Sequence, residues 1–211
     1  MKTMLRFYSP LISDVADSLG IHVGVLPMEI RPILPDPTVK FCGPAFPCRV
    51  VPTDEYVEID TILEMVDAIP DGAVVLVAAD APIEAALWGG LMSTRSYARG
   101  AVGAVTNGPV RDIAQIASLG FPVYATGACM RDIRRRGYMH SFGVPVTIGD
   151  VAIAPGDIVF ADANGVIVIP QNDFPTILAE LERALGEEAR VHDGLMKGGD
   201  AVDMFKEHGR F

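Results

Sequence analysis

Three short apolar stretches in the middle of the chain constrain its fold more than any other feature. Residues 73–79, 101–107 and 121–127 contain no charged side chain, and the segments between them end at Gly100 and Gly120. Uninterrupted apolar runs of this kind are typical of strands that are buried on both faces, whereas the intervening segments have helical length. An alternation of three strands with two helices implies parallel pairing with right-handed crossovers. We therefore expect an α/β fold with parallel βαβ units.

The segments on either side of this region predict further helices and a group of hairpins. A short helix is expected over residues 14–19, with Ser13 as its N-cap, and another over 59–69, where apolar residues recur at helical spacing. Residues 144–170 alternate short apolar runs with turn sequences such as Asn-Gly, which is typical of β-hairpins. A long final helix is expected over residues 173–192.

The length of 211 residues suits one large domain or two small ones. No segment has the composition of a flexible linker, and no internal repeat interrupts the pattern. We therefore interpret residues 1–211 as a single domain. Within it, residues 173–211 are expected to form a C-terminal helical extension at a subunit interface.

The composition excludes several classes of protein. Half of the residues are hydrophobic and 21% are charged, which excludes a disordered chain. The net charge of −10 argues against nucleic-acid binding, which depends on Lys and Arg neutralising phosphates. No apolar run reaches the roughly 18 residues of a membrane span, so we expect no membrane partner. The three cysteines match no common zinc-site spacing, and we expect them to be reduced thiols of a cytoplasmic protein.

A pair of glycines at the start of an expected helix is the first candidate binding site. Glycine lets a backbone approach a ligand closely, and the amides of a first helical turn bind anions. This reasoning assigns an anionic ligand to the backbone of Gly89, Gly90, Leu91 and Met92. The alternative is that the two glycines only permit close contact between a helix and the sheet.

The dipeptide Arg111-Asp112 is the second candidate, and we expect it in the first turn of a helix over 109–119. The planar fork of arginine can hold a carboxylate or an enolate oxygen, and aspartate is a hard ligand suited to Mg²⁺ or Mn²⁺. Both candidates follow the carboxyl ends of strands expected to be neighbours, where ligands collect in parallel sheets. A small 2-oxo acid carries the matching carboxylate and ketone. The alternative is a solvated ion pair near a helix start.

Residues 131–136 (RDIRRR) are the only basic run in the sequence. Such a run can bind an RNA or an acidic partner. In so acidic a chain, however, a solvated segment or a salt-bridge site between subunits is favoured. The four histidines are scattered and form no pair with metal-ligand spacing.

The stretch 88–112 (WGGLMSTRSYARGAVGAVTNGPVRD) resembles the signature of the RraA-like family, and residues 9–20 and 144–170 resemble two further parts of it. The family includes class II 4-hydroxy-4-methyl-2-oxoglutarate/4-carboxy-4-hydroxy-2-oxoadipate aldolases and regulators of ribonuclease E activity. The resemblance implies a three-layer β/β/α swivelling-domain fold with a β-hairpin segment and a C-terminal helix. It also implies homotrimers, or hexamers made of two trimers, and a divalent metal cation, Mg²⁺ or Mn²⁺.

The resemblance assigns roles to individual residues. Arg111 matches the family's substrate-binding arginine, and Asp112 matches its metal ligand. In the aldolases a glutamate from a neighbouring subunit also reaches the metal through water, and Glu187 or Glu188 is the nearest match. The family's substrate-binding loop is matched by Gly89, Gly90, Leu91 and Met92.

Two positions depart from the family pattern. Gly90 stands where the aldolases usually carry an acidic residue, and Asn107 stands where the family usually has Asp. The acidic residue helps to hold the water shell of the metal. Its absence affects an aldol cleavage, which must remove a hydroxyl proton, more than it affects decarboxylation of oxaloacetate.

The resemblance and the residues together predict a divalent-metal-dependent lyase that cleaves a C–C bond of small 2-oxo acids to give pyruvate. The expected activity is that of a 4-hydroxy-4-methyl-2-oxoglutarate aldolase, an oxaloacetate decarboxylase, or both. The alternative is a non-catalytic, protein-binding regulator of the ribonuclease E inhibitor type, which needs no metal. A third interpretation, a demethylmenaquinone methyltransferase, is disfavoured because the sequence has no glycine-rich nucleotide fingerprint.

Overall fold

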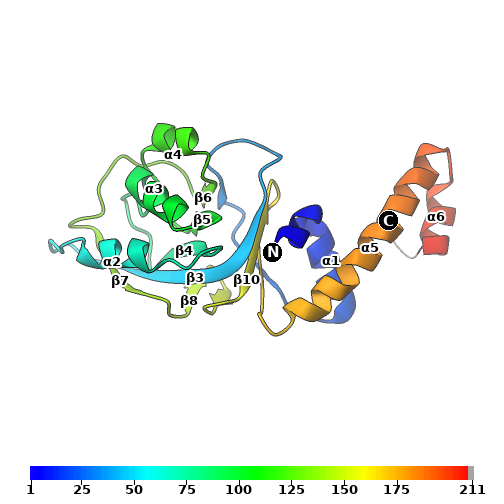
Figure 1. Cartoon of the computed structure of the whole chain (residues 1–211), viewed down its shortest axis with the longest axis horizontal. Coiled ribbons are helices and arrows are strands. Elements are labelled where there is room, and N and C mark those ends of the chain that lie inside the picture. Colours follow the sequence, from blue (N-terminus) through cyan, green and yellow to red (C-terminus); the bar gives the residue numbers. More distant parts are fainter. Residues whose placement is uncertain (209–211) are drawn as a thin grey trace.

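The chain folds into a body and an arm, which lie side by side in Figure 1. The computed structural model describes residues 1–208, so the last three residues of the expected extension over 173–211 lie outside the described residues. The helices of the body are α2 (Asp60–Ala68), α3 (Gly90–Ala98) and α4 (Ile113–Leu119). The helices of the arm are η1 (Lys2–Arg6), α1 (Ser9–Leu19), α5 (Phe174–Met196) and α6 (Ala201–His208).

Within the described residues, the main sheet has nine strands, in the order β1-β11-β10-β3-β4-β5-β6-β2, with β7 paired to β3. Strands β8 and β9 form a separate pair. The strands are β1 (Gly24–Val25), β2 (Arg31–Pro32), β3 (Phe41–Pro52), β4 (Val74–Ala79), β5 (Gly103–Thr106), β6 (Val123–Ala125), β7 (Gly137–Phe142), β8 (Val146–Ile148), β9 (Val151–Ile153), β10 (Ile158–Asp162) and β11 (Gly165–Ile169).

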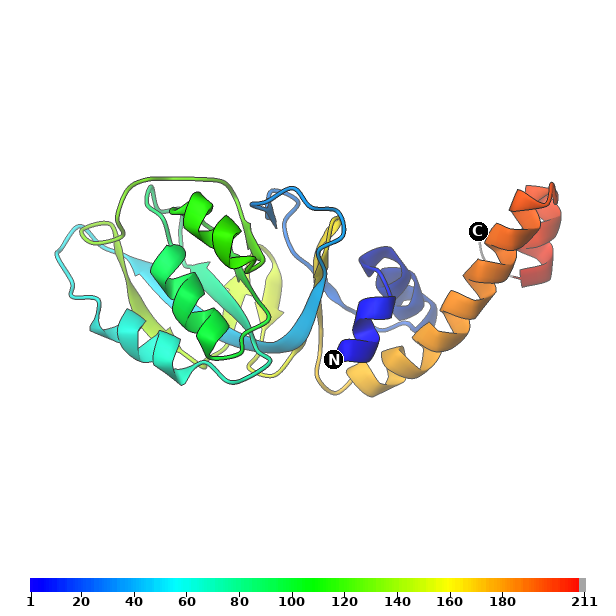
Figure 2. The same cartoon turned by 45° about the horizontal axis from the view of Figure 1, so that its top comes forward.

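The predicted parallel core is confirmed, because β3 pairs with β4, β4 with β5 and β5 with β6, all in parallel. Strand β4 is buried on both faces. Val75 and Val77 belong to the core on the side of the helices, whereas Val74 and Leu76 belong to a core shared with β8 to β11. Figure 2 shows α2, α3 and α4 on one side of the sheet. The result is the expected three-layer β/β/α arrangement.

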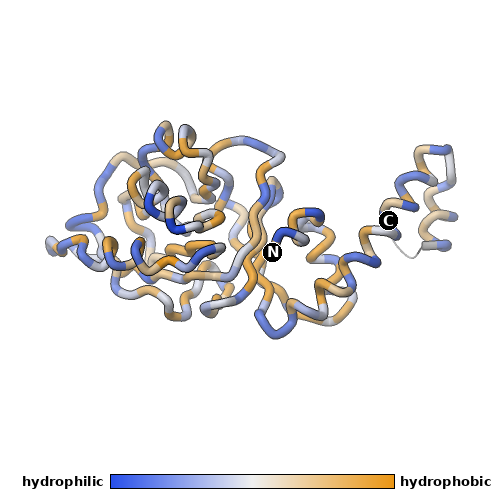
Figure 3. Tube along the Cα trace, in the orientation of Figure 1, coloured by the Kyte–Doolittle hydropathy of each residue, from blue (hydrophilic) through white to orange (hydrophobic). Residues whose placement is uncertain are grey.

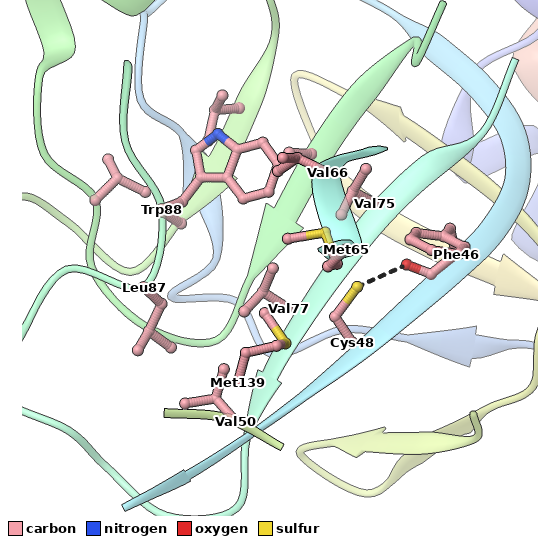
Figure 4. Close-up of a cluster of buried hydrophobic side chains, with 14 of the residues drawn as sticks. Phe46, Cys48, Val50, Met65, Val66, Val75, Val77, Leu87, Trp88 and Met139 are labelled. Carbon is pink, nitrogen blue, oxygen red and sulfur yellow. Dashed lines mark hydrogen bonds between the residues drawn. The ribbon is translucent and has the colours of Figure 1, made fainter. Parts of the chain in front are cut away.

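The core on the helix side includes Met65 of α2, Val75 and Val77 of β4, and Trp88 (Figure 4). The Trp88 side chain is only 2% exposed. Burial of a large aromatic side chain contributes strongly to stability and leaves it little freedom to move. The loop that carries Trp88 toward α3 is therefore fixed to the core.

The arm packs on β10 and β11 through a separate core, to which α1 contributes Leu11 and Ile12 and α5 contributes Leu181. Figure 3 shows apolar and polar residues alternating along α5, as expected for a helix that buries one face. The carboxylate of Asp162, at the end of β10, accepts hydrogen bonds from the N–H and the Oγ of Ser9, each at 2.8 Å. Within residues 1–208, no helix combines the length and the apolar composition that crossing a membrane requires.

Two predicted helix boundaries are wrong. Helix α1 starts at Ser9, so Ser13 lies inside the helix and is not its N-cap. The physical reason is a long-range cap, because the first amide of α1 is bound by Asp162 of a distant strand. Helix α5 continues beyond residue 192 to Met196.

Candidate active site

Three loop segments continue the parallel pairing of the sheet beyond the ends of its strands. Trp88 pairs with Val110, and Val110 pairs with Ala128, both in parallel. The N–H of Arg111 donates to the carbonyl oxygen of Trp88 at 3.0 Å, and the N–H of Cys129 donates to that of Val110 at 2.9 Å. This short ladder brings the glycine loop, the Arg-Asp dipeptide and the segment after β6 to one edge of the body.

The glycine loop is anchored by Trp88 and Ser93. The indole Nε1 donates to Ser93 Oγ at 2.7 Å, and Ser93 Oγ donates to the carbonyl oxygen of Gly89 at 3.1 Å. Ser93 is fully buried. The position of Gly89 is therefore set by the core.

The two predicted site features touch one another. The N–H of Gly90 donates to Asp112 Oδ2 at 3.1 Å. A Cβ atom on Gly89 would lie 2.9 Å from the same oxygen, and one on Gly90 would lie 3.1 Å from Asp112 Cβ and would clash with Gln115 Oε1. Glycine is therefore required for the close approach to Asp112. The amide of Gly90, expected to hold a ligand, is instead occupied by this carboxylate.

The structure corrects the expected start of the helix over 109–119. Arg111 is in extended backbone that pairs with Trp88, and α4 begins only at Ile113. Asp112 forms the sharp turn between them, with a left-handed backbone at φ 60°. Aspartate tolerates this conformation better than most residues. The pairing of this segment with its neighbours competes with helix formation, and no local pattern indicated it.

The guanidinium of Arg111 lies between two carboxylates. Its Nη1 donates to Asp132 Oδ2 at 3.0 Å, and its Nε lies 3.7 Å from Asp112 Oδ2. The side chains of Arg111 and Asp112 are 40% and 38% exposed, so solvent-borne ligands can reach both. Arg111 is thereby oriented while part of its donor fork remains accessible.

Asp132 is itself held in the charged form. Its Oδ1 accepts hydrogen bonds from the Arg134 side chain at 2.8 Å and from the Arg134 N–H at 2.9 Å. Chiefly the side-chain bond from Arg134, with a smaller contribution from Arg111, holds the pKa of Asp132 well below its usual value, although partial burial opposes this. Asp132 therefore stays ionised beside Arg111 at neutral pH.

A cavity of about 940 Å³ opens beside Arg111 and Asp112. Its lining includes Val110 and Ala128 of the ladder and the residues that follow them, Arg111 to Ile113 and Cys129 to Arg131. In the described part of the chain, the loop 89–92 does not line this cavity. The lining residues are Glu84, Val110, Arg111, Asp112, Ile113, Ala128, Cys129, Met130 and Arg131.

The carboxylates expected from a neighbouring subunit lie in the arm. Glu187 is paired with Arg183, and Glu188 accepts a hydrogen bond from the hydroxyl of Tyr8. Figure 1 places α5 across the molecule from α3 and α4. Among residues 1–208 of a single chain, no group of three or more His, Cys, Asp or Glu side chains could hold a metal ion. Asp112 and Glu84 are the carboxylates that line the cavity, and Mg²⁺ can bind through one carboxylate while keeping several waters.

Sequence reasoning missed the role of Asp132 and of Asn107. The composition of the run 131–136 predicts a solvated segment or a salt-bridge site between subunits, whereas Asp132 bridges Arg111 and Arg134 within the chain. An acidic residue inside a basic run is a signal for such a bridge. The amide of Asn107 accepts from the N–H of Ala79 at 2.8 Å and donates to its carbonyl oxygen at 2.9 Å. An aspartate cannot donate the second bond, so Asn107 suits the junction of β4 and β5.

The sequence profile of a known family, RraA-like and described as Aldolase/RraA, matches residues 9–168. The chain is 29% identical over 199 residues to "Protein DlpA" of Legionella pneumophila, and the match covers 94% of this chain. The chain spans only 32% of the length of that relative.

Two further comparisons cover most of both chains. A protein of Halalkalibacterium halodurans named "Putative 4-hydroxy-4-methyl-2-oxoglutarate aldolase" is 29% identical over 88% of this chain and 85% of its own length. The crystal structure of Streptomyces coelicolor RraAS2, described as an unusual member of the RNase ES inhibitor RraA family, superimposes with a TM-score of 0.77 at 24% identity. That superposition covers 92% of this chain and 94% of the other. At 24% identity it supports a shared fold only.

Proposed function

This chain belongs to the RraA-like family, and we propose that it is a lyase that cleaves a C–C bond of small 2-oxo acids to give pyruvate. The observation that carries the proposal is the placement of Arg111. Its guanidinium is oriented by Asp132, lies beside Asp112 and lines an open cavity. A planar guanidinium in such a position can bind the head group of a 2-oxo acid. The aldolase names of relatives within the family support the same reaction class.

The proposed reaction breaks the bond between C3 and C4 of the substrate. The electron pair of that bond moves toward the C2 ketone, so that pyruvate leaves as its enolate and is then protonated at C3. In oxaloacetate the departing fragment is CO₂. In 4-hydroxy-4-methyl-2-oxoglutarate it is a second pyruvate, and the 4-hydroxyl proton must also be removed. Arg111 donates hydrogen bonds to the oxygen on which negative charge develops, an effect worth about a hundredfold or more in rate.

Asp112 is the residue that would hold a divalent cation, Mg²⁺ or Mn²⁺. When bound, such an ion supplies Lewis-acid polarisation of the substrate ketone. The N–H of Gly90 donates to Asp112 Oδ2, and the side chain of Asp112 is 38% exposed, so the carboxylate is fixed in position and remains accessible to a cation. In this proposal Asp112 binds the cation, and Arg111 binds the substrate and stabilises the negative charge that develops on its oxygen.

The proposed enzyme acts as a homotrimer or as a hexamer of two trimers. The arm supports this part of the proposal, because it carries Glu187 and Glu188 away from the site of its own chain (Figure 1). A neighbouring copy can then bring one of them to Asp112. Residues 173–211 would accordingly form a subunit interface.

The neighbourhood of Gly90 favours decarboxylation over aldol cleavage. No carboxylate is available at position 90, and the side chain of Gln115 occupies the space beside it. A neutral amide is a poor base. Removal of the 4-hydroxyl proton is therefore expected to be slower than loss of CO₂.

A non-catalytic regulator is the second candidate function. Exposed apolar side chains beside the site favour it, because Met130 is 92% exposed and Leu91 is 82% exposed. Such side chains suit a protein contact. A regulator of this kind requires no metal, so metal-dependent turnover separates the two functions.

The test is pyruvate release from oxaloacetate and from 4-hydroxy-4-methyl-2-oxoglutarate, each with Mg²⁺, with Mn²⁺ and with EDTA. The rate without protein is subtracted, because free metal ions decarboxylate oxaloacetate slowly. The proposal predicts turnover that EDTA abolishes, with oxaloacetate preferred. No turnover of either compound under any condition would contradict the lyase and favour the regulator.

A further inference from the structure

The cavity beside Arg111 contains a second guanidinium, which the proposed reaction leaves unused. Arg131 lines the same cavity of about 940 Å³ as Arg111. Its carbonyl oxygen accepts a hydrogen bond from the N–H of Ala86 at 3.0 Å, and Ala86 is buried. The backbone that carries Arg131 is therefore tied to the segment leading to Trp88.

Among residues 1–208, the guanidinium of Arg131 is paired with one carboxylate, that of Glu84, and this ion pair is exposed. The Nη1 of Arg131 lies 2.7 Å from Glu84 Oε2, and the two side chains are 54% and 89% exposed. An ion pair this exposed is strongly screened by water and contributes little. A carboxylate of a ligand in the cavity can therefore replace Glu84 at small cost.

The other arginines of the run 131–136 have different tasks. Arg134 is bound to Asp132, with its Nε 2.8 Å from Oδ1. The guanidinium of Arg135 lies over the ring of Tyr56, 5.6 Å from its centroid. Neither Arg134 nor Arg135 is among the residues that line the cavity. Arg131 is the arginine of the run that lines the cavity together with Arg111.

The lining of the cavity also includes uncharged residues that suit a short carbon chain, namely Val110, Ala128 and Cys129, and Val110 is fully buried. The two carboxylates of the lining are Asp112, which is assigned to the cation, and Glu84, which is 89% exposed. Arg111 and Arg131 therefore remain to bind the two carboxylates of a small dianion. We propose that Arg131 binds the distal carboxylate of a dicarboxylic 2-oxo acid whose 2-oxo acid end is held by Arg111. This inference rests on the proposed function, and it names the residue of the same site that recognises the distal carboxylate.

A matched pair of substrates tests the inference. 4-Hydroxy-4-methyl-2-oxoglutarate and 4-hydroxy-4-methyl-2-oxopentanoate differ only in that a methyl group replaces the distal carboxylate. Cleavage of the first gives two pyruvates, and cleavage of the second gives pyruvate and acetone. The intrinsic reactivity of the two substrates is the same for every variant, so the change in the ratio of the two kcat/KM values between wild type and variant measures recognition of the distal carboxylate.

Three variants sharpen the comparison. Arg131→Gln is expected to lower the ratio by about tenfold to a hundredfold, the effect of one charge-assisted hydrogen bond, while cleavage of the monocarboxylate stays near the wild-type rate. Glu84→Gln is expected to keep or raise the ratio, because it removes the competing carboxylate. Arg95→Gln, which breaks an equally exposed pair with Asp67 outside the cavity, is the control and should leave the ratio unchanged.

A binding measurement separates failure of this inference from failure of the proposed function. Calorimetric titration with 2-oxoglutarate and with 2-oxopentanoate, in the presence of Mg²⁺, needs no turnover. If turnover persists but Arg131→Gln leaves the ratio unchanged, the inference is overturned and the lyase stands. If turnover is absent but Arg131→Gln weakens binding of 2-oxoglutarate and not of 2-oxopentanoate, the dianion site is supported and the lyase activity is contradicted. Absence of both turnover and binding overturns both.

Discussion

The body and the arm of this chain bury apolar residues in different ways. In the body, β4 is buried along its whole length and on both faces, and the site sits on loops that this sheet fixes. In the arm, Leu181 is fully buried, but Met196, Val202 and Phe205 beyond it are 75%, 58% and 53% exposed. The loops of the site therefore rest on a fully buried core. At the end of the arm, by contrast, α5 and α6 leave large apolar side chains exposed within one chain.

The largest effect is expected where the arm meets the body. Leu181→Ala opens a cavity in the core that α5 shares with β10 and β11, so unfolding should become easier by about 2–5 kcal/mol. The control is Leu178, which is only partly buried against the same core. Leu178→Ala should lower the free energy of unfolding clearly less than Leu181→Ala does. Urea denaturation of both variants measures the difference. Equal costs would show that the arm is not packed as described.

The next largest effect is expected on the catalytic rate when the proposed metal ligand in the body is removed, with the stability of the fold unchanged. Asp112→Ala removes the proposed metal ligand, and kcat/KM for oxaloacetate should fall by about a hundredfold or more. Asp67→Asn removes a carboxylate outside the cavity that also pairs with an arginine, Arg95, and it should leave the rate unchanged. Steady-state assays with saturating Mg²⁺ measure both variants, and thermal unfolding checks that each is folded.

A smaller effect is expected from the residue that orients Arg111. Asp132→Asn weakens a charge-assisted hydrogen bond to Arg111, so kcat should fall about tenfold with little change in the fold. If Asp132 acts through Arg111, Arg111→Ala should lower kcat clearly less in the Asp132→Asn background than it does in the wild type. A double-mutant cycle measures this coupling, and strict additivity would contradict the orienting role.

Acid titration tests the same residue. The pKa of Asp132 is lowered in the folded protein, so its contribution to stability is present above its ordinary value of about 3.9 and is lost as the pH falls below it. The wild type should therefore lose more unfolding free energy on acidification below about pH 5 than Asp132→Asn does. Urea denaturation at a series of pH values measures this, and parallel curves would contradict the charged state of Asp132.

The smallest effect is expected at the glycine loop. Gly90→Ala places a methyl group against Asp112 and Gln115, which should cost about 1 kcal/mol of stability and lower kcat/KM a few-fold. Removing the obstructing side chain in Gly90→Ala/Gln115→Ala should recover part of the loss. If the double variant recovers nothing, the contact with Asp112 dominates.

Much of the body could be predicted from sequence because its signal is local. The apolar runs of β4, β5 and β6 and the glycines that end the helices between them indicate a parallel sheet without reference to distant residues. The order of the elements then brings Gly89-Gly90 and Arg111-Asp112 to one edge. Their contact through the N–H of Gly90 follows that prediction.

The rest depends on contacts between distant segments. The start of α1 is set by Asp162, and the extended backbone of Arg111 is set by its pairing with Trp88. The bond between Arg111 and Asp132 joins two loops that only the folded sheet makes neighbours. No periodicity or spacing along the chain contains this information.

The most direct test of the central claim is the rate of pyruvate formation from oxaloacetate by Arg111 variants. Arg111→Lys keeps the charge but loses the planar fork, and Arg111→Ala loses both. With Mg²⁺ present and the uncatalysed rate subtracted, both variants should show kcat/KM lowered by at least about a hundredfold, while Arg95→Lys stays at the wild-type value. Near-wild-type rates in either Arg111 variant, with the fold intact, would contradict the claim that Arg111 stabilises the developing enolate.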